Sequence, residues 1–297
     1  MLKLSALNFS SLYDQKDVRC ELKDTVELAP HLEEMGYHRY WLGEHHTFNA
    51  AYSSPELLLP LIAQATTKLR LGVAGIRIHL HNPFKIAKDF AMLASLFPNR
   101  IDLGLAASGV DEPTKMAFGN PVYRPLPKCV KALTDNLDAA SLSWKISEVS
   151  HPPFIRGSAE LDYWMLSNGG RSTTKAAAEQ GLALGLAFFI KPKDPCPSIV
   201  YNYREAFIPV GTRTEPKVNI VVSGVCAETT EEAHNLANHW LNHGLRRNVV
   251  GNQDECRKAI LDLKATYNVD EVVFLDLSPT YKAKMQSYRL LSEALLT

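Results

Sequence analysis

Short hydrophobic segments alternate with longer amphipathic segments along the whole chain. The short segments are rich in aliphatic and aromatic residues, which is typical of β-strands buried on both faces. The longer segments repeat apolar residues every three or four positions, which predicts helices with one buried face. The predicted strands cover residues 2–7, 40–42, 71–78, 101–106, 163–166, 183–189, 218–225 and 271–275. The predicted helices cover residues 22–35, 55–66 (beginning after Ser54), 83–96, 126–142, 172–180, 198–207, 230–243, 253–267 and 281–296.

This alternation predicts an α/β fold with a parallel sheet, because strands separated by helices are joined by right-handed crossovers. Eight strand–helix units favour closure into a (β/α)8 TIM-like barrel, with an open doubly wound sheet as the alternative. A chain of 297 residues fits one such domain. The segments 143–162 and 190–197 carry several prolines. We expect them to be long loops over the active face.

Composition narrows the class of protein. The 32 basic and 32 acidic residues cancel, so nothing indicates a nucleic-acid groove or an anionic membrane surface as partner. The sequence has neither a long uninterrupted apolar stretch nor a signal-peptide pattern, so we expect a cytoplasmic protein without a membrane span. The five cysteines are far apart and lack C-x-x-C spacing, which favours reduced thiols and no metal site.

The first candidate site follows the second predicted strand, where Glu44, His45 and His46 come directly after an apolar run. The carboxyl ends of barrel strands converge on one face, which is where active sites form. Histidine is the side chain best suited to proton transfer near neutral pH. We therefore predict Glu44 and His45 as catalytic residues. The alternative is a pair of surface histidines beside a helix-capping glutamate.

The second candidate site is the turn between the fifth predicted strand and the next helix. Glycines let the backbone approach a ligand closely, and the N-terminus of a helix attracts an anion. Neighbouring hydroxyl and guanidinium groups add donors. The predicted phosphate-binding residues are Asn168, Gly169, Gly170, Arg171, Ser172 and Thr173. The spacing is not that of a Walker loop, and the alternative is an ordinary turn capped by Ser172 and Thr173.

The third candidate lies in the strand over residues 71–78. Ala74 and Gly75 are small enough to leave space for a flat ligand or for the barrel axis. Arg77 interrupts an apolar strand, so we expect it to point outward or to pair. A metal site built on His79 and His81 would need a third ligand from the preceding strand, and ordinary loop histidines are the commoner case.

Taken together, these segments resemble the bacterial-luciferase-like flavin monooxygenase family. The resemblance spans nearly the whole chain, and its most specific parts are Glu44-His45-His46 and Asp102-Leu103-Gly104-Leu105. The similar segments are 36–46, 53–56, 69–72, 82–83, 97–105, 167–174, 176–181, 228–237, 249–251 and 269–271.

The resemblance implies one luciferase-like barrel domain over residues 1–297 that binds reduced FMN or, in a sister group, the deazaflavin F420. Reduced flavin and O2 would form a C4a-peroxyflavin that oxygenates a small organic substrate, while the protein orients the reactants and excludes water. The family's catalytic histidine corresponds to His45. Its bulge beneath the flavin ring, often a cis peptide, corresponds to Ala74-Gly75. The resemblance also implies a separate flavin reductase as the source of reduced FMN, and a homodimer formed through helices of the second and third units.

One departure from the family stands at Ala107, where members commonly carry an arginine that reaches the flavin phosphate. Loss of that pair is expected to weaken binding by about 1.5–3 kcal/mol unless Arg171 compensates. Two alternatives therefore stay open beside the monooxygenase: an F420-dependent hydride-transfer enzyme, and a flavin-binding protein without catalysis. A barrel aldolase or isomerase would need a Schiff-base lysine or a carboxylate base at a strand end, and neither is clearly placed.

Overall fold

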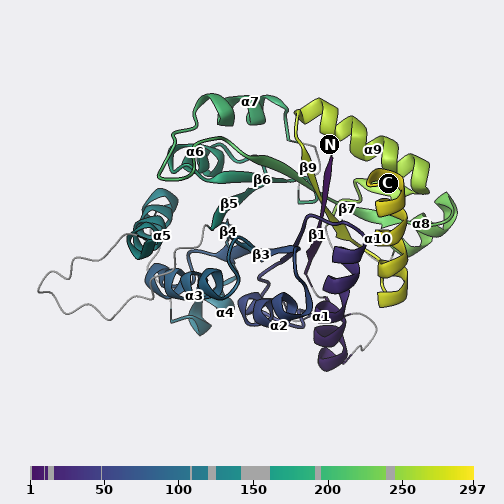
Figure 1. The fold of residues 1–297 in the computed structure, drawn as a ribbon, viewed down its shortest axis with the longest axis horizontal. Coiled ribbons are helices and arrows are strands. Elements are labelled where there is room, and N and C mark those ends of the chain that lie inside the picture. The colour runs from purple at the N-terminus through teal and green to yellow at the C-terminus, as the bar shows by residue number, and fades with distance from the viewer. Residues whose placement is uncertain are drawn as a thin grey trace, which may run out of the picture.

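The fold is a closed parallel barrel surrounded by helices (Figure 1). The computed structural model describes residues 2–9, 11–12, 17–47, 49–107, 109–119, 125–141, 161–190, 195–238 and 245–297. The barrel strands are β1 (Lys3–Asn8), β2 (Arg39–Leu42), β3 (Arg70–Arg77), β4 (Ile101–Ala106), β5 (Asp162–Ser167), β6 (Ala183–Ala187), β7 (Val218–Cys226) and β9 (Glu271–Asp276). They pair in chain order, β9 pairs with both β1 and β7, and the β6–β7 pairing completes the ring. The predicted eight-stranded TIM barrel is confirmed.

The helices follow the strands in the predicted order. They are α1 (Val18–Glu34), α2 (Leu59–Ala65), α3 (Pro83–Leu96), α4 (Glu112–Ala117), α5 (Leu126–Ser141), α6 (Arg171–Glu179), α7 (Ser198–Glu205), α8 (Thr230–Ala237), α9 (Gln253–Tyr267) and α10 (Tyr281–Leu295). In the part of the chain that the structure describes, no helix is long and apolar enough to cross a membrane.

Three details differ from the prediction. The segment after Ser54 begins as a 3-10 turn, η1 (Pro55–Leu57), and the Ser54 side chain does not cap it. The short helix α4 was not predicted. The strand β8 (Val249–Gly251) was not predicted either, and it extends the sheet beside the last residues of β7. Most of the predicted loops at 143–162 and 190–197, and the end of the predicted helix over 230–243, lie outside the described residues.

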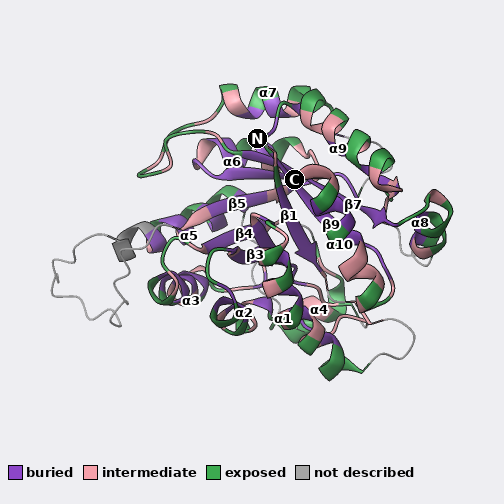
Figure 2. Ribbon diagram, turned by 45° about the vertical axis from the view of Figure 1, so that its right-hand side comes forward, coloured by how far each residue is buried: buried purple, intermediate pink, exposed green. Residues whose placement is uncertain are grey.

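Alternate residues of most barrel strands belong to two separate apolar clusters. Tyr40 and Leu42 pack outward against the helices, whereas Trp41 between them packs inside the barrel with Trp164. The strands are buried on both faces, while the helices expose their outer surfaces (Figure 2). This double burial explains why the strands appear in the sequence as continuous apolar runs.

Strand β3 changes this alternation halfway along. Its pairing with β4 shifts between Val73 and Ile76, at the cis peptide bond Ala74-Gly75. Before the shift the odd-numbered Val73 packs outward, and after it the even-numbered Ile76 does. A one-residue change of register sends every following side chain to the other face of a strand. Residue 77 therefore lies on the inner face of the barrel.

The amino-terminal end of the barrel interior is filled by an ion-pair network, which we call the barrel floor. Arg39 is its centre: Nη1 donates to Asp102 Oδ2 at 2.6 Å, and Nε donates to Glu271 Oε1 at 2.5 Å. The guanidinium also lies 5.1 Å from the ring centroid of Trp41 and 4.8 Å from that of Trp164. Burial alone would lower the pKa of Arg39, but the two carboxylates raise it above its ordinary value.

Further charges surround this centre. Arg70 bonds Asp102 at 2.5 Å and Asp162 at 3.2 Å, and Lys217 bonds Asp162 at 2.9 Å. Each buried charge of the barrel floor thus has an opposite charge in contact with it, which is the condition under which ions are tolerated in a protein interior.

Candidate functional site

A cavity of about 690 Å³ opens at the carboxyl ends of the strands, opposite the barrel floor. Cofactor and substrate sites usually fall between about 300 and 1,000 Å³. One part of its lining is apolar and includes Leu7, Phe9, Leu166, Phe189, Ile190, Val221 and Leu245. The polar part includes Glu44, His45, Arg77, Asn168, Ser172 and Thr173. We call this end of the interior the barrel mouth.

Most of the residues predicted from the sequence line this one cavity. They are Glu44, His45, Ala74, Gly75, Ala107, Asn168, Gly170, Ser172 and Thr173. Gly169 and Arg171 belong to the same turn but are not among the lining residues, and Arg171 is exposed. The peptide bond between Ala74 and Gly75 is cis, as the family resemblance implied.

His45 is held by the ring of Phe9. The two ring centroids are 4.3 Å apart in an edge-to-face arrangement. The Phe9 ring also covers Gly43, where it leaves no room for a Cβ atom. Burial, and then the charge of Arg77, lower the pKa of His45 to about 4. The imidazole is therefore neutral at pH 7, with one nitrogen able to accept a proton or hydrogen bond and the other able to donate a hydrogen bond.

Glu44 is buried and fully engaged with its neighbours. Its Oε1 lies 2.7 Å from His46 Nε2 and 2.8 Å from His81 Nε2, and its Oε2 accepts the backbone N–H of Arg77 at 2.8 Å. Burial alone would raise the pKa of Glu44, but these hydrogen bonds, led by His81, lower it below its usual range. Glu44 is therefore an anion that ties the end of β2 to the end of β3.

The turn between β5 and α6 has the predicted form. Gly169 has φ of 85° and donates its N–H to Ser167 Oγ at 3.1 Å. Gly170 is the N-cap of α6, and no side chain caps the helix there. The predicted capping by Ser172 and Thr173 is therefore wrong, because both residues stand inside the first turn of α6, where they line the cavity.

Arg77 was not predicted as a site residue, yet it lines the cavity. The register shift in β3 is what turns it inward, beside Ala106 of β4. Its Nη1 donates to the carbonyl of Gly109 at 3.2 Å. The expectation that Arg77 has a partner is therefore confirmed. The expectation that it points outward is wrong. The sequence did contain a signal for this residue, because Arg77 is an isolated charge within an apolar strand. The sequence did not show whether its side chain points into the barrel or out of it.

The histidines after β3 take other partners. His81 bonds Glu44, and His79 Nδ1 lies 3.8 Å from the thiol of Cys129. Among the described residues, no group of three His, Cys, Asp or Glu side chains is arranged to hold a metal ion.

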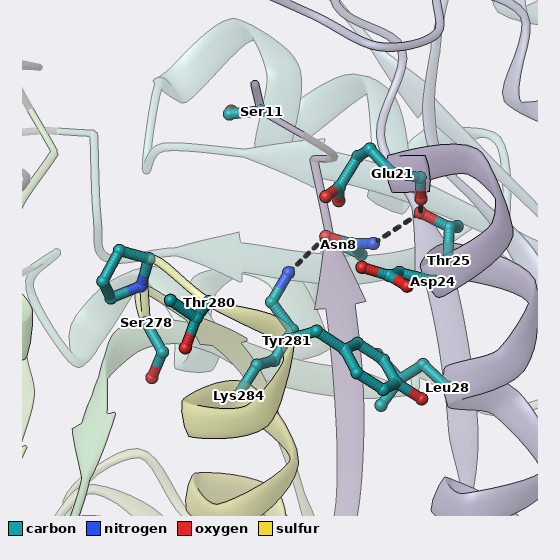
Figure 3. Close-up of a pocket in the computed structure, with 11 residues that line it drawn as sticks. Asn8, Ser11, Glu21, Asp24, Thr25, Leu28, Ser278, Thr280, Tyr281 and Lys284 are labelled. Atoms are coloured by element: carbon teal, nitrogen blue, oxygen red, sulfur yellow. Dashed lines mark hydrogen bonds between the residues drawn. The ribbon is translucent and has the colours of Figure 1, made fainter. Parts of the chain in front are cut away.

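A second cavity lies outside the barrel, between α1 and α10 (Figure 3). Its volume is about 20 Å³, enough for little more than one water molecule. Asn8 crosses it, donating to Thr25 Oγ1 at 3.2 Å and accepting from Lys284 Nζ at 3.3 Å. This cavity is too small to hold a substrate, so the barrel mouth is the candidate active site.

Comparison with known proteins identifies the family of the chain. The family model described as luciferase-like monooxygenase matches residues 4–275. The chain belongs to the luciferase-like monooxygenase family. This membership supports an oxidoreductase that acts on a small molecule.

Several relatives match over the full length of the chain. The uncharacterized protein YceB of Bacillus subtilis (strain 168) is 30% identical, with all of both chains covered. The N-acetyl-S-alkylcysteine monooxygenase of the same organism is 26% identical, covering 100% of this chain and 99% of the relative. Among solved structures, apo-MsnO8 superposes with a TM-score of 0.86 at 28% identity, covering 100% of this chain and 99% of that one.

More distant structures share the fold of the luciferase-like monooxygenases and differ in cofactor. The oxygenating constituent of 3,6-diketocamphane monooxygenase from Pseudomonas putida, in complex with FMN, has a TM-score of 0.76 at 15% identity, covering 99% of this chain and 98% of that one. An F420-dependent secondary alcohol dehydrogenase has a TM-score of 0.70 at 14% identity, covering 99% of each chain. The fold is therefore compatible with either flavin.

Proposed function

We propose that the protein is a monooxygenase that uses reduced FMN and O2 to oxygenate a small organic substrate. The observation that carries the proposal concerns one cavity in a luciferase-like monooxygenase. It is lined both by His45 and by Asn168, Gly170, Ser172 and Thr173 at the start of α6. A proton-transfer group and an anion-binding turn on one cavity are what a phosphorylated redox cofactor and its substrate require.

The described residues fit reduced FMN. Asn168, Ser172 and Thr173 offer side-chain donors beside the N-terminus of α6, where a phosphate is favoured by the helix dipole. The apolar lining, with Leu166 and Val221 among it, suits a flat aromatic ring. When bound, reduced FMN would supply the electrons that activate O2.

His45 is the group we propose for proton transfer at the reacting centre. At pH 7 its neutral imidazole can accept a proton at one nitrogen without first having to lose one. Phe9 restricts the rotation of the ring and keeps it against the cavity wall. Positioning of this kind matters because small displacements of a reacting group are costly to the rate.

Glu44 acts as a positioning residue in this proposal. Its carboxylate is 1% exposed and bonds His46, His81 and the backbone of Arg77. By connecting the ends of β2 and β3, it sets the distance between His45 and the bulge at Ala74-Gly75. The apolar side chains Phe9, Phe189 and Leu245 would exclude water from the reacting ring.

Anaerobic titration with reduced FMN, followed by rapid mixing with O2, tests the proposal. We expect saturable binding, and then a transient absorbance that differs from those of free reduced and free oxidised FMN. A parallel titration with reduced F420 addresses the alternative cofactor. Tighter binding of F420 and no reaction with O2 would favour the hydride-transfer enzyme, and binding of neither flavin would contradict both.

The remaining partners are part of the proposal. A separate reductase would supply reduced FMN, which suits a cofactor that enters and leaves through an open cavity. A homodimer through the second and third units agrees with the exposed apolar side chains there, among them Leu61 on α2 and Leu96 on α3.

A further inference from the structure

We infer that Arg77 binds the terminal phosphate of the flavin and makes the cavity selective for a phosphorylated flavin over its dephosphorylated form. This inference rests on the proposed function, because it assigns a residue to the cofactor proposed there. Arg77 would bind the phosphate in place of the arginine that members of the family commonly carry at the position of Ala107.

The first argument is the charge of the cavity lining. Among the described lining residues, Arg77 is the one lysine or arginine. His45 is neutral at pH 7, and Glu44 is an anion. A phosphate that enters this cavity therefore has one permanent positive side chain to pair with, and a guanidinium matches the geometry of a phosphate in bidentate hydrogen bonds.

The second argument is position. Strand pairing places Arg77 beside Ala106, and Ala106 beside Leu166, so the three lie at one level across β3, β4 and β5. Two strand spacings amount to about 10 Å. Leu166 is followed by the last residue of β5, by the turn that contains Asn168, and then by the start of α6, which contains Thr173. An anion seated on that turn would lie between α6 and the end of β3.

The third argument is the direction of the side chain. Nη1 of Arg77 donates to the Gly109 carbonyl at 3.2 Å, and Gly109 belongs to the loop that leaves β4. The guanidinium is therefore carried from β3 over the end of β4, which is the strand next to β5. Ala107, on that same loop and also lining the cavity, carries only a methyl group there.

Arg171 is the other arginine near the turn, and it makes a matched control. It is the first residue of α6, is exposed, and is not among the lining residues. If nearby positive charge alone determined phosphate binding, Arg171 and Arg77 would contribute alike. If contact inside the cavity is required, only Arg77 contributes.

The experiment compares the Kd of reduced FMN with that of reduced riboflavin, which lacks the phosphate, by anaerobic ultrafiltration. For Arg77→Met we expect the Kd of FMN to rise by about 10- to 100-fold, while that of riboflavin changes by less than about threefold. Arg171→Met should keep the wild-type ratio of the two Kd values. Adding Ala107→Arg to Arg77→Met should restore most of the preference for FMN.

Arg77→Lys is a second variant, which keeps the charge but not the fork of donors, and we expect an intermediate ratio. Thermal melting identifies the variants that are folded. A wild-type ratio of Kd values in every folded Arg77 variant would overturn the inference while leaving the proposed function intact. Binding of neither flavin to the wild-type protein would instead contradict the proposed function itself.

Discussion

The two ends of the barrel interior are built from similar residue types and differ in how those residues are used. At the barrel floor, Arg39 is 3% exposed and its guanidinium is shared between two carboxylates and two indole rings. At the barrel mouth, Arg77 and His45 face a cavity of about 690 Å³. Charges at the floor are satisfied by the protein, whereas those at the mouth are placed around a volume that a ligand can fill. The difference teaches that polar residues inside a barrel indicate function only when the structure leaves space beside them.

The largest expected effect is on stability and comes from the floor. Arg39→Ala would leave Glu271 buried without its cation and Asp102 with Arg70 alone, and breaking a buried ion pair typically costs about 3–5 kcal/mol. We expect the free energy of unfolding in urea to fall by that amount. Lys217→Ala is the control, because Lys217 is 58% exposed and lies at the edge of the same network. Its loss should cost less than about 1 kcal/mol. An equal loss of unfolding free energy in the two variants would mean that the buried ion pairs of the barrel floor contribute no more to stability than an exposed pair does.

The second effect is on activity and comes from the mouth. His45→Gln keeps a polar side chain but cannot transfer a proton, so we expect turnover to fall by about a hundredfold or more. The urea midpoint should stay close to that of the wild type, because the substitution leaves the floor intact. Turnover with each candidate substrate is measured from substrate-dependent product formation with reduced FMN and O2. Full turnover in the folded variant would remove His45 from the mechanism.

The smallest effect depends on pH and concerns the pair of His81 and Glu44. Burial alone would lower the pKa of His81, but Glu44 raises it above its ordinary value. A raised histidine pKa stabilises the fold fully below about pH 6.5, and this contribution is lost as the pH rises through the folded-state pKa. The Glu44 pKa is lowered, so its contribution is present above about pH 4.3 and is lost as the pH falls through its folded-state pKa.

We therefore expect His81→Asn to lose about 1 kcal/mol of stability near pH 6 and less near pH 9. Denaturant unfolding at the two pH values measures this difference. The exposed pair Lys258–Asp262 on α9 gives a control, since Lys258→Ala should cost little and equally at both values. A loss that is the same at pH 6 and pH 9 would mean that the charge of His81 contributes nothing.

The sequence by itself determined the barrel and most of its mouth. Apolar runs separated by amphipathic helices specify the eight barrel strands, and residues at the carboxyl ends of such strands must converge. This is why His45 and Thr173, far apart in the chain, were both predicted and line one cavity. Gly169 in the turn before α6 also follows from local chemistry, because a residue with φ of 85° favours glycine.

Only the tertiary structure decided which face of each strand is the inner one. A strand buried on both sides has no polar face to reveal its orientation, so Trp41 and Tyr40 are equivalent in the sequence although one packs inside the barrel and the other outside. The register shift between Val73 and Ile76 is a property of the β3–β4 pairing, and it reverses the direction of Arg77. The barrel floor likewise needs Arg39, Asp102 and Glu271 together, and no local pattern brings residues so distant in the chain into contact.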